Sequence, residues 1–339
     1  MTAARVVRWL WGESPGARLA RLPLLPLAGA YWAAMRVRAA RYAAAGVARL
    51  PLPTIAVGNL SVGGTGKTPL AAWIATYYAG RGWKPGILLR GYGGDEPLVH
   101  RRLVPEAVVV ANADRTAGAI AARAAGARVL VLDDAYQLLG VARDLNVAVL
   151  SAESAAESPW PLPAGPWREG WGALARADLI VVTRKRAAPA VAARLADQLA
   201  QRRCLVPVAI AWLAIDHLAG MQSGTRRDLS ALAGRDVVAA AGIAEPESFA
   251  AQLAAAGARV QLMAYQDHHQ YRAADVDRLV RAAAAGGYVV VTEKDAVKLR
   301  GRWPAAPEPW VAELRIRWER NDRAVEQALD AALAPAGRP

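Results

Sequence analysis

From residue 53 onward, the chain alternates short apolar runs with segments of helical period. The apolar runs lie within residues 55–57, 86–89, 106–110, 128–132, 147–150 and 179–183, and they are continuous rather than alternating with polar positions. Such runs are typical of strands buried on both faces, and therefore of a parallel sheet. Helices are expected at residues 68–79 and 115–125. The order of elements predicts a doubly wound, mostly parallel α/β fold.

A second and shorter block of the same kind begins near residue 235. Strands are expected at residues 237–241 and 288–292, with a helix ending near residue 253 and another at 274–285. This block predicts a smaller α/β lobe. We therefore expect an N-terminal helical segment at residues 1–50, a core at 51–230 and a C-terminal lobe at 231–339.

The first 50 residues follow a different pattern. An apolar stretch at residues 22–35 contains two prolines, lies among tryptophans and a tyrosine, and is followed by arginines, namely Trp9, Trp11, Tyr31, Trp32, Arg36, Arg38, Arg41 and Arg49. The stretch is shorter than the roughly 20 residues that span a bilayer, and no cleavage site of a signal peptide follows it. This combination predicts a segment that lies on an anionic membrane surface. A helical hairpin packed on the protein's own core is the alternative.

The net charge of +13 indicates which kinds of partner the protein could bind. A basic chain favours an anionic partner, which could be nucleic acid, an acidic lipid surface or a phosphorylated substrate, although an Arg- and Ala-rich composition accounts for part of the bias. No stacking-aromatic motif or known nucleic-acid reader occurs, so nucleic-acid binding is not expected. The single cysteine, Cys204, excludes an internal disulfide and a cysteine-rich metal site.

Residues 61–68, SVGGTGKT, directly follow the first apolar run and precede the first predicted helix. A phosphate-binding loop needs glycines that let backbone N–H groups approach the phosphates, a lysine for the β- and γ-phosphates and a hydroxyl for Mg²⁺. Lys67 and Thr68 supply the last two, and Ser61 stands where the general pattern has glycine. We expect nucleotide contacts from the loop residues Ser61, Gly63, Gly64, Thr65, Gly66, Lys67 and Thr68.

A phosphate loop also needs an acidic residue at the end of a neighbouring strand, to hold the metal ion. The run at 129–132 ends in Asp133 and Asp134. Ligands of such sheets bind at the carboxyl ends of the strands. The sequence therefore predicts an ATP site with Mg²⁺ held near Thr68, Asp133 and Asp134.

Several ordered motifs resemble those of the tetraacyldisaccharide 4'-kinases, the kinases of the lipid A pathway. They run across nearly the whole chain and read GNLSVGGTGKTP (58–69), RGYGG (90–94), GDEP (94–97), LDDAYQ (132–137), ARD (142–144), LPAGPWRE (162–169), DHH (267–269) and TEKDAVK (292–298). The first carries Ser and Pro at the positions where the family has them. The resemblance implies a P-loop NTPase-like fold and transfer of the ATP γ-phosphate to the 4'-hydroxyl of an acylated glucosamine disaccharide 1-phosphate. It also implies a peripheral location at the cytoplasmic face of the bacterial inner membrane.

The resemblance places the family's catalytic Asp on Asp95 and its partner His on His268. A carboxylate beside an imidazole can share the work of accepting the hydroxyl proton, and the sequence leaves open which of the two is the base. We expect Asp95 in the first lobe and His268 in the second, so that closure of the lobes would assemble the pair. With Lys67, these form the predicted catalytic set.

Further cations are candidates for phosphate contacts or, alternatively, for ion pairs that fix loops; they are Arg90, Arg168, Lys294 and Lys298. Glu293 and Asp295 could contact nucleotide or order their loop. The chain also departs from the family pattern. The loop before Asp95 is short, Leu138 replaces a family His, and residues 158–161 replace a Gly-Asn-Gly. These differences could mean altered acyl-chain preference or reduced activity.

Two other functions compete with the kinase. A membrane-associated regulatory NTPase or metal-insertion chaperone could use the same loop, but such chaperones usually carry Cys or His clusters, and this chain has one cysteine and four histidines. An inactive scaffold would have no need for Lys67, Thr68, Asp133, Asp95 and His268 together. The pattern favours the kinase.

Overall fold

The computed structural model describes residues 3–91, 94–153, 160–202, 205–304 and 307–334. The chain forms two compact units. Unit 1 comprises residues 1–90, 104–211 and 318–339, and unit 2 comprises residues 91–103 and 212–317. The domain limits expected at residues 50 and 230 remain predictions, because the compact units are a separate, geometric division.

Six parallel strands lie wholly within the described parts of unit 1, and the continuous apolar runs predicted all of them. In space their order is β6-β5-β1-β4-β2-β3. Their bounds are β1 Thr54–Asn59, β2 Pro85–Leu89, β3 Val108–Ala111, β4 Val129–Leu132, β5 Leu145–Ser151 and β6 Leu179–Arg184. Most of these strands are buried along their whole length, as the prediction of a sheet covered on both faces requires.

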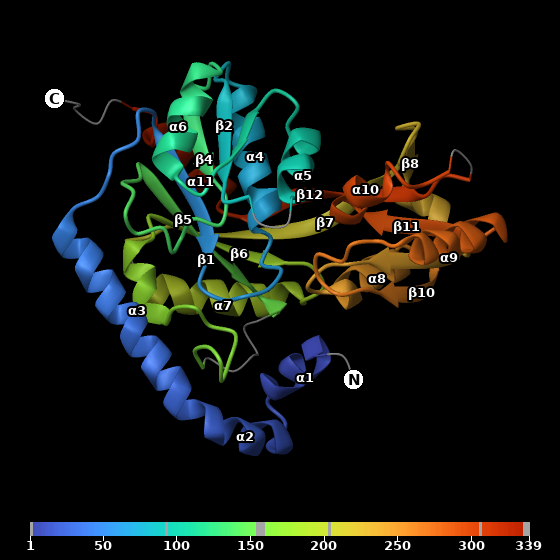
Figure 1. Cartoon of the computed structure of the whole chain (residues 1–339), viewed down its shortest axis with the longest axis horizontal. Helices are drawn as coiled ribbons and strands as arrows, with labels where there is room; N and C mark the ends of the chain where they lie inside the picture. The colour runs from blue at the N-terminus through green and yellow to red at the C-terminus, as the bar shows by residue number, and fades with distance from the viewer. Residues whose placement is uncertain (1–2, 92–93, 154–159, 203–204, 305–306, 335–339) are drawn as a thin grey trace. The chain divides into compact units, whose positions relative to one another are not determined.

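Helices cover the strands of unit 1 (Figure 1). Apolar residues of α6 (Arg115–Ala124) and α7 (Pro189–Arg202) pack against β2, β4, β5 and β6, and α4 (Lys67–Ala79) lies against β1, β2 and β4. The C-terminal helix α11 (Asp322–Ala331) is tied to α4, because the Tyr78 hydroxyl donates to the Leu329 carbonyl at 2.9 Å. A short 3₁₀ helix, η3, spans Trp171–Arg176.

The N-terminal segment of unit 1 is a series of helices, α1 (Ala3–Leu10), α2 (Pro15–Arg21), the 3₁₀ helix η1 (Leu22–Leu24) and α3 (Leu25–Ala45). The two prolines of the apolar stretch, Pro23 and Pro26, lie in the first turns of η1 and α3, where a missing N–H costs little. Apolar residues are spread around α3 rather than gathered in one stripe. None of the helices in the described parts of the chain combines the length and apolar character that crossing a bilayer requires.

Unit 2 has a second set of parallel strands, in the order β10-β9-β11-β12. The elements are α5 (Glu96–Leu103), β8 (Arg226–Asp228), the 3₁₀ helix η4 (Leu229–Leu232), β9 (Asp236–Ala241), α8 (Pro246–Ala255), β10 (Arg259–Ala264), α9 (Ala273–Ala284), β11 (Tyr288–Thr292) and α10 (Glu293–Leu299). α8 packs on one face of these strands, and α9 and α10 pack on the other. The smaller lobe is therefore an α/β layer structure, as predicted.

Two long strands were not predicted. β7 (Val208–Gly220) and β12 (Trp310–Arg320) each contribute residues to both units. β7 pairs with β8 in the antiparallel sense, with His217 opposite Asp228.

Candidate active site

The phosphate loop lies between β1 and α4, as the sequence predicts. α4 begins at Lys67, and its N-cap residue Gly66 has φ +85°. Gly63 has φ +121°, a value that side-chain-bearing residues rarely adopt. The loop therefore ends at a helix N-terminus whose first N–H groups have no intrahelical acceptors, which is the geometry that binds phosphate oxygens.

Buried side chains fix the shape of this loop. The Asn59 amide donates to the Ser61 carbonyl at 2.6 Å and to the Thr65 hydroxyl at 2.9 Å. The Thr183 hydroxyl donates to the Thr65 carbonyl at 2.8 Å, and the Lys185 ammonium donates to the Gly64 carbonyl. Thr183 belongs to β6 and Lys185 follows it, so two strands hold the loop. Lys185 was not predicted, and its only signal in the sequence is a cation at the end of a buried strand.

The segment that contains LPAGPWRE runs beside the loop. Val62 N donates to the Pro166 carbonyl at 2.8 Å, and Arg168 N donates to the Leu60 carbonyl at 2.7 Å. This backbone pairing brings the Arg168 guanidinium to Asp134, with Nη1 at 3.2 Å from Oδ1. Glu169 instead pairs with Arg176 at 2.8 Å. Arg168 therefore pairs with Asp134 rather than with its neighbour in the sequence, Glu169.

Asp133 and Asp134 lie in different environments. Asp133 is buried, and its Oδ1 accepts from Asp134 N at 2.8 Å. Asp134 has φ +51°, its side chain is 43% exposed, and Oδ1 lies 3.6 Å from Lys67 Nζ. Thr68 is buried at the start of α4. Lys67 and Asp134 form an ion pair that the sequence did not predict, and the two acids sit at the carboxyl end of β4.

A glycine lets the turn that contains Asp133 and Asp134, the acidic turn, approach β1. A Cβ added at Gly58 would lie 2.4 Å from the Tyr136 nitrogen, closer than such atoms ever approach. Gln137 then ties the turn to β1, because its amide donates to the Asn59 carbonyl at 2.7 Å. Leu138, which replaces the family His, packs against an apolar cluster with residues of β4 and α6.

Arg115 is a second cation that was not predicted as part of the site. It is buried at the start of α6 and donates to the Asn112 carbonyl. Burial lowers the pKa of Arg115, as does the nearby Arg90, while Asp133 and Asp134 act in the opposite direction. Arg115 therefore contributes positive charge to the acidic turn.

Unit 2 brings Asp95 and His268 together. The Asp95 carboxylate is 3% exposed, and both of its oxygens lie 3.2 Å from His268 Nδ1. Lys298 Nζ lies 3.0 Å from Asp95 Oδ2, and the Lys298 side chain is 6% exposed. Burial acts to raise the pKa of Asp95, but Lys298 and His268 together bring it below the ordinary value.

The expected assembly of this pair by lobe closure is corrected by the structure. Residues 91–103 belong to unit 2, because α5 packs against α10. Asp95 directly precedes α5 and accepts from Val99 N at 3.0 Å through its carbonyl. The pair therefore lies within one unit, and its formation needs no movement between units. Lys298, a candidate for phosphate contacts, is the ion-pair partner of Asp95.

The two adjacent histidines have different partners. His268 is 40% exposed and adopts φ +57°. His269 stacks on Tyr265, with ring centroids 4.8 Å apart, and its Nε2 lies 3.0 Å from Asp275 Oδ2. Asp275 is in the first turn of α9. The geometry therefore gives His269 a place in the packing of α9, and it leaves His268 as the histidine beside Asp95.

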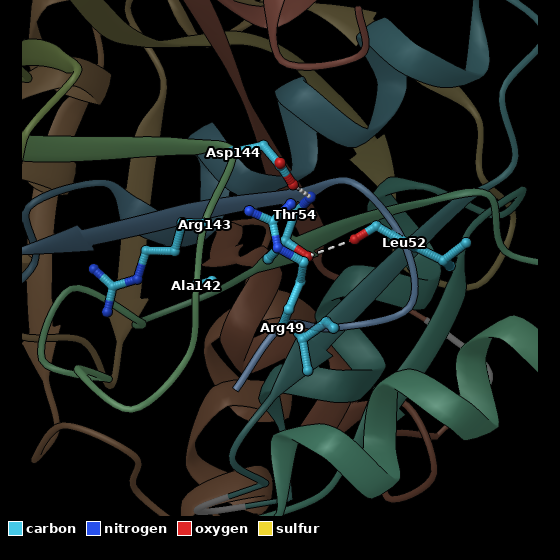
Figure 2. Close-up of a pocket in the computed structure, with 7 residues that line it drawn as sticks. Arg49, Leu52, Thr54, Ala142, Arg143 and Asp144 are labelled. Carbon is cyan, nitrogen blue, oxygen red and sulfur yellow. Dashed lines mark hydrogen bonds between the residues drawn. The ribbon is translucent and has the colours of Figure 1, made fainter. Parts of the chain in front are cut away.

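A small pocket in unit 1 lies away from the phosphate loop. It is lined by residues around Thr54, the first residue of β1, including Arg49, Arg143 and Asp144. Thr54 N donates to Asp144 Oδ2 at 2.7 Å, and the Thr54 hydroxyl donates to the Leu52 carbonyl at 2.8 Å (Figure 2). Burial lowers the pKa of Arg143 to about 10. This pocket is at the amino end of β1, whereas the ligands of such sheets bind at the carboxyl ends.

Comparison with known proteins points to one family. The family model for tetraacyldisaccharide-1-P 4'-kinase matches residues 20–94 and 93–334, and its two parts meet where the loop before Asp95 is short. Among curated relatives, the tetraacyldisaccharide 4'-kinase of Anaeromyxobacter sp. (strain K) is 38% identical, with 97% of this chain and 96% of the relative covered. The enzyme of the same name from Methylobacterium sp. (strain 4-46) is 37% identical, with 95% and 96% covered.

A solved structure shows the same fold. The crystal structure of LpxK from Aquifex aeolicus in complex with ATP matches with a TM-score of 0.71 and 24% identity, and it covers 93% of this chain and 99% of that chain. The family model and the curated relatives extend over nearly the full length of the sequence. The chain belongs to the tetraacyldisaccharide-1-P 4'-kinase family.

Proposed function

We propose that this protein transfers the γ-phosphate of ATP to the 4'-hydroxyl of a tetraacyldisaccharide 1-phosphate, with the phosphate loop of unit 1 holding the nucleotide and the Asp95–His268 pair of unit 2 activating the hydroxyl. Membership of the family supports the kinase activity and a glycolipid substrate. The assignment of individual residues is a proposal that rests on their geometry.

In this proposal, the loop binds the triphosphate through backbone N–H groups and the N-terminus of α4. Lys67 neutralises the β- and γ-phosphates. Lys67 and Arg168 both face the Asp134 carboxylate, at 3.6 and 3.2 Å. Both cations are therefore held close to the loop, and a bound γ-phosphate would compete with Asp134 for them.

The residues present fit Mg²⁺. A threonine hydroxyl and carboxylates are the oxygen ligands that Mg²⁺ prefers, and the ion usually completes its shell with substrate phosphates and water. Among the described residues, no group of three or more His, Cys, Asp or Glu side chains could hold a metal ion alone. Thr68, Asp133 and Asp134 would hold the ion with the nucleotide, and the ion would neutralise charge on the transferred phosphate.

For the hydroxyl, we propose that His268 takes the proton and Asp95 orients it. The Asp95 carboxylate is 3% exposed and already contacts Lys298 and His268, so it is a poor position for a substrate hydroxyl. His268 is the exposed member of the pair. Its Nδ1 faces Asp95, which leaves Nε2 for the substrate. This pairing of a buried carboxylate with an exposed imidazole is the single observation that carries the mechanism.

We also propose a peripheral site of action, on an anionic membrane surface at the cytoplasmic face of the inner membrane. Most of the exposed large apolar side chains belong to the N-terminal helices and their flanks, including Trp9, Leu19, Leu22, Leu27, Trp32 and Val37. Arg36, Arg41 and Arg49 are exposed in the same segment. Apolar and cationic side chains together suit the headgroup region of an anionic bilayer.

Phosphate transfer to lipid tests the activity directly. ATP labelled at the γ-phosphate is incubated with a tetraacyldisaccharide 1-phosphate in detergent micelles, and label is followed in the lipid and in free phosphate. We expect label in the lipid, dependent on Lys67 and His268. ATP hydrolysis that proceeds equally without lipid, with no labelled lipid, would instead support the regulatory NTPase.

Flotation with vesicles tests the location. We expect the protein to float with vesicles that contain anionic lipid, and the double variant Leu27→Ser/Trp32→Ser to float less. Ile120→Ser is the matched control, because Ile120 is an exposed apolar residue on α6. Equal flotation of all three proteins would contradict a role for the N-terminal helices.

A further inference from the structure

Helix α10 contacts α5, which follows Asp95, and it is linked through Gly242 to the loop that carries His268. It begins after Thr292, whose hydroxyl accepts from Asp295 N at 3.2 Å and so caps the helix. Asp295 and Lys298 are three residues apart on α10 and therefore lie on one side of it. Asp295 is buried and the Lys298 side chain is 6% exposed, which is unusual for ionisable residues unless they have partners.

Asp295 is linked to the loop that carries His268. Its Oδ2 accepts from Gly242 N at 3.1 Å and from the Thr292 hydroxyl at 2.6 Å. The carbonyl of the same Gly242 accepts from His268 N at 3.2 Å. A Cβ at Gly242 would lie 2.9 Å from Asp295 Oδ1, so the glycine permits this close contact. One short path of hydrogen bonds thus runs from α10 to the backbone of His268.

Lys298 holds the other member of the pair. Its Nζ lies 3.0 Å from Asp95 Oδ2, and both side chains are almost fully buried. The groups that act on the Asp95 carboxylate are Lys298 from α10, His268 from the loop after β10, and the backbone at Asp95 itself. Burial opposes ionisation of Asp95, and Lys298 is the largest influence in the other direction.

We propose that α10 is a brace for the hydroxyl-activating pair, in which Asp295 positions His268 and Lys298 keeps Asp95 charged and in place. This inference rests on the proposed function, and it makes Lys298 and Asp295 positioning residues that do not touch the substrate. The role explains why an acid and a lysine occur three residues apart in the motif TEKDAVK.

The variant Lys298→Met tests the charge part of the brace. Without Lys298, burial of Asp95 is opposed only by His268 and the backbone at Asp95, so Asp95 should take up a proton at higher pH. We expect the acid limb of the pH–kcat profile to move up by about one pH unit or more, with the KM for ATP unchanged. Arg300→Met, at an exposed cation just past α10, is the matched control and should leave the profile in place.

The variant Asp295→Ala tests the positioning part. It removes the link to Gly242 but leaves Lys298 beside Asp95. We expect kcat to fall by about tenfold or more with no shift of the acid limb, because the charge on Asp95 is retained. The two variants therefore differ in pH dependence, which a loss of folding alone would not produce.

A readout independent of lipid phosphorylation separates this inference from the proposed function. The nitrogen signals of His268, one of four histidines, should change at the pH where Asp95 is protonated. In Lys298→Met, this change should move to higher pH even if no lipid substrate is turned over. If neither the signals nor the acid limb move, the brace is wrong; if the signals move but the wild type labels no lipid, only the proposed function is wrong.

Discussion

The phosphate loop of unit 1 and the Asp95–His268 site of unit 2 are built in opposite ways. The loop is eight consecutive residues, and its shape depends on backbone conformations such as φ +121° at Gly63. The second site takes one residue from each of three segments, Asp95, His268 and Lys298, and depends on buried charges. Its members are far apart in the sequence, with a separation of 173 positions between Asp95 and His268.

This difference determines how each site responds to pH. Backbone N–H groups carry no titratable charge, so the loop should bind phosphate over a wide pH range. The second site contains two ionisable groups with little access to water, Asp95 and Lys298, so its geometry and its stability should both depend on pH. Variants of the two sites should therefore differ in how their activity and stability depend on pH.

The largest expected effect is that of His268→Ala, which removes one side chain of the Asp95–His268 site and leaves the phosphate loop unchanged. Loss of a general base typically lowers kcat by about 10²–10⁴-fold. Steady-state transfer to the glycolipid measures this. His269→Asn, which changes the neighbouring histidine in the packing of α9, should lower kcat far less. Equal losses in both variants would mean that the whole loop, rather than His268, was disturbed.

Lys67→Met removes the lysine of the phosphate loop and leaves the Asp95–His268 site unchanged. Removing one preorganised charge at a transferring phosphate costs about 10²–10³-fold in kcat by analogy with other electrostatic stabilisers. The same assay across pH should show a loss that is uniform, because Lys67 acts as a fixed charge. A shift of the pH profile in this variant would contradict the separation of the two sites.

Gly58→Val tests the packing that supports the loop. A side chain at this position would collide with the backbone of Tyr136, and relief would move the acidic turn away from β1. We expect a loss of about 1–3 kcal/mol in the free energy of unfolding, measured with denaturant. Gly29→Ala in α3 meets no neighbouring atom, so it should be neutral or stabilising. Equal stability of both variants would refute the close contact.

Glu293→Gln is expected to have the smallest effect on activity and a pH-dependent effect on stability. Burial raises the pKa of Glu293, the first residue of α10, to about 8, with a further contribution from Glu313. Between the ordinary pKa and this value, the unfolded chain releases a proton that the folded protein keeps, so stability falls as pH rises. A glutamine side chain does not titrate, so the variant does not lose stability in this way as pH rises.

The free energies of unfolding of Glu293→Gln and the wild type, measured with denaturant, test that prediction. Their difference should grow in favour of the variant from pH 5 to pH 8, by an amount on the order of a few kcal/mol at most. A constant difference across this range would show that Glu293 is ionised in the folded protein.

The sequence predicted most of the fold and the loop site because their signals are local. Continuous apolar runs identify the buried strands of unit 1, and the spacing of Gly63, Gly66, Lys67 and Thr68 specifies the loop. β12 was missed because its second half alternates arginines with apolar residues, as in a strand with one exposed face. The resemblance supplied Asp95 and His268, but not the unit in which they meet.

The contacts that complete each site could not be predicted. Lys298 and Lys185 look like other surface cations in the sequence, and only the packing of α5 on α10, or of β6 beside the loop, gives them partners. Asn59 lies within an ordinary strand, and its role depends on where its amide points. Such contacts between distant segments arise from tertiary packing, which local patterns do not encode.

The most direct test of the division between the two sites is the affinity for ATP with Mg²⁺, measured by titration calorimetry for the wild type, Lys67→Met and His268→Ala, beside single-turnover transfer to the glycolipid. We expect His268→Ala to bind ATP as the wild type does while transferring phosphate at least about 10²-fold more slowly. Lys67→Met should lose both. Wild-type transfer by His268→Ala, or a loss of its ATP binding, would contradict the assignment of hydroxyl activation to unit 2.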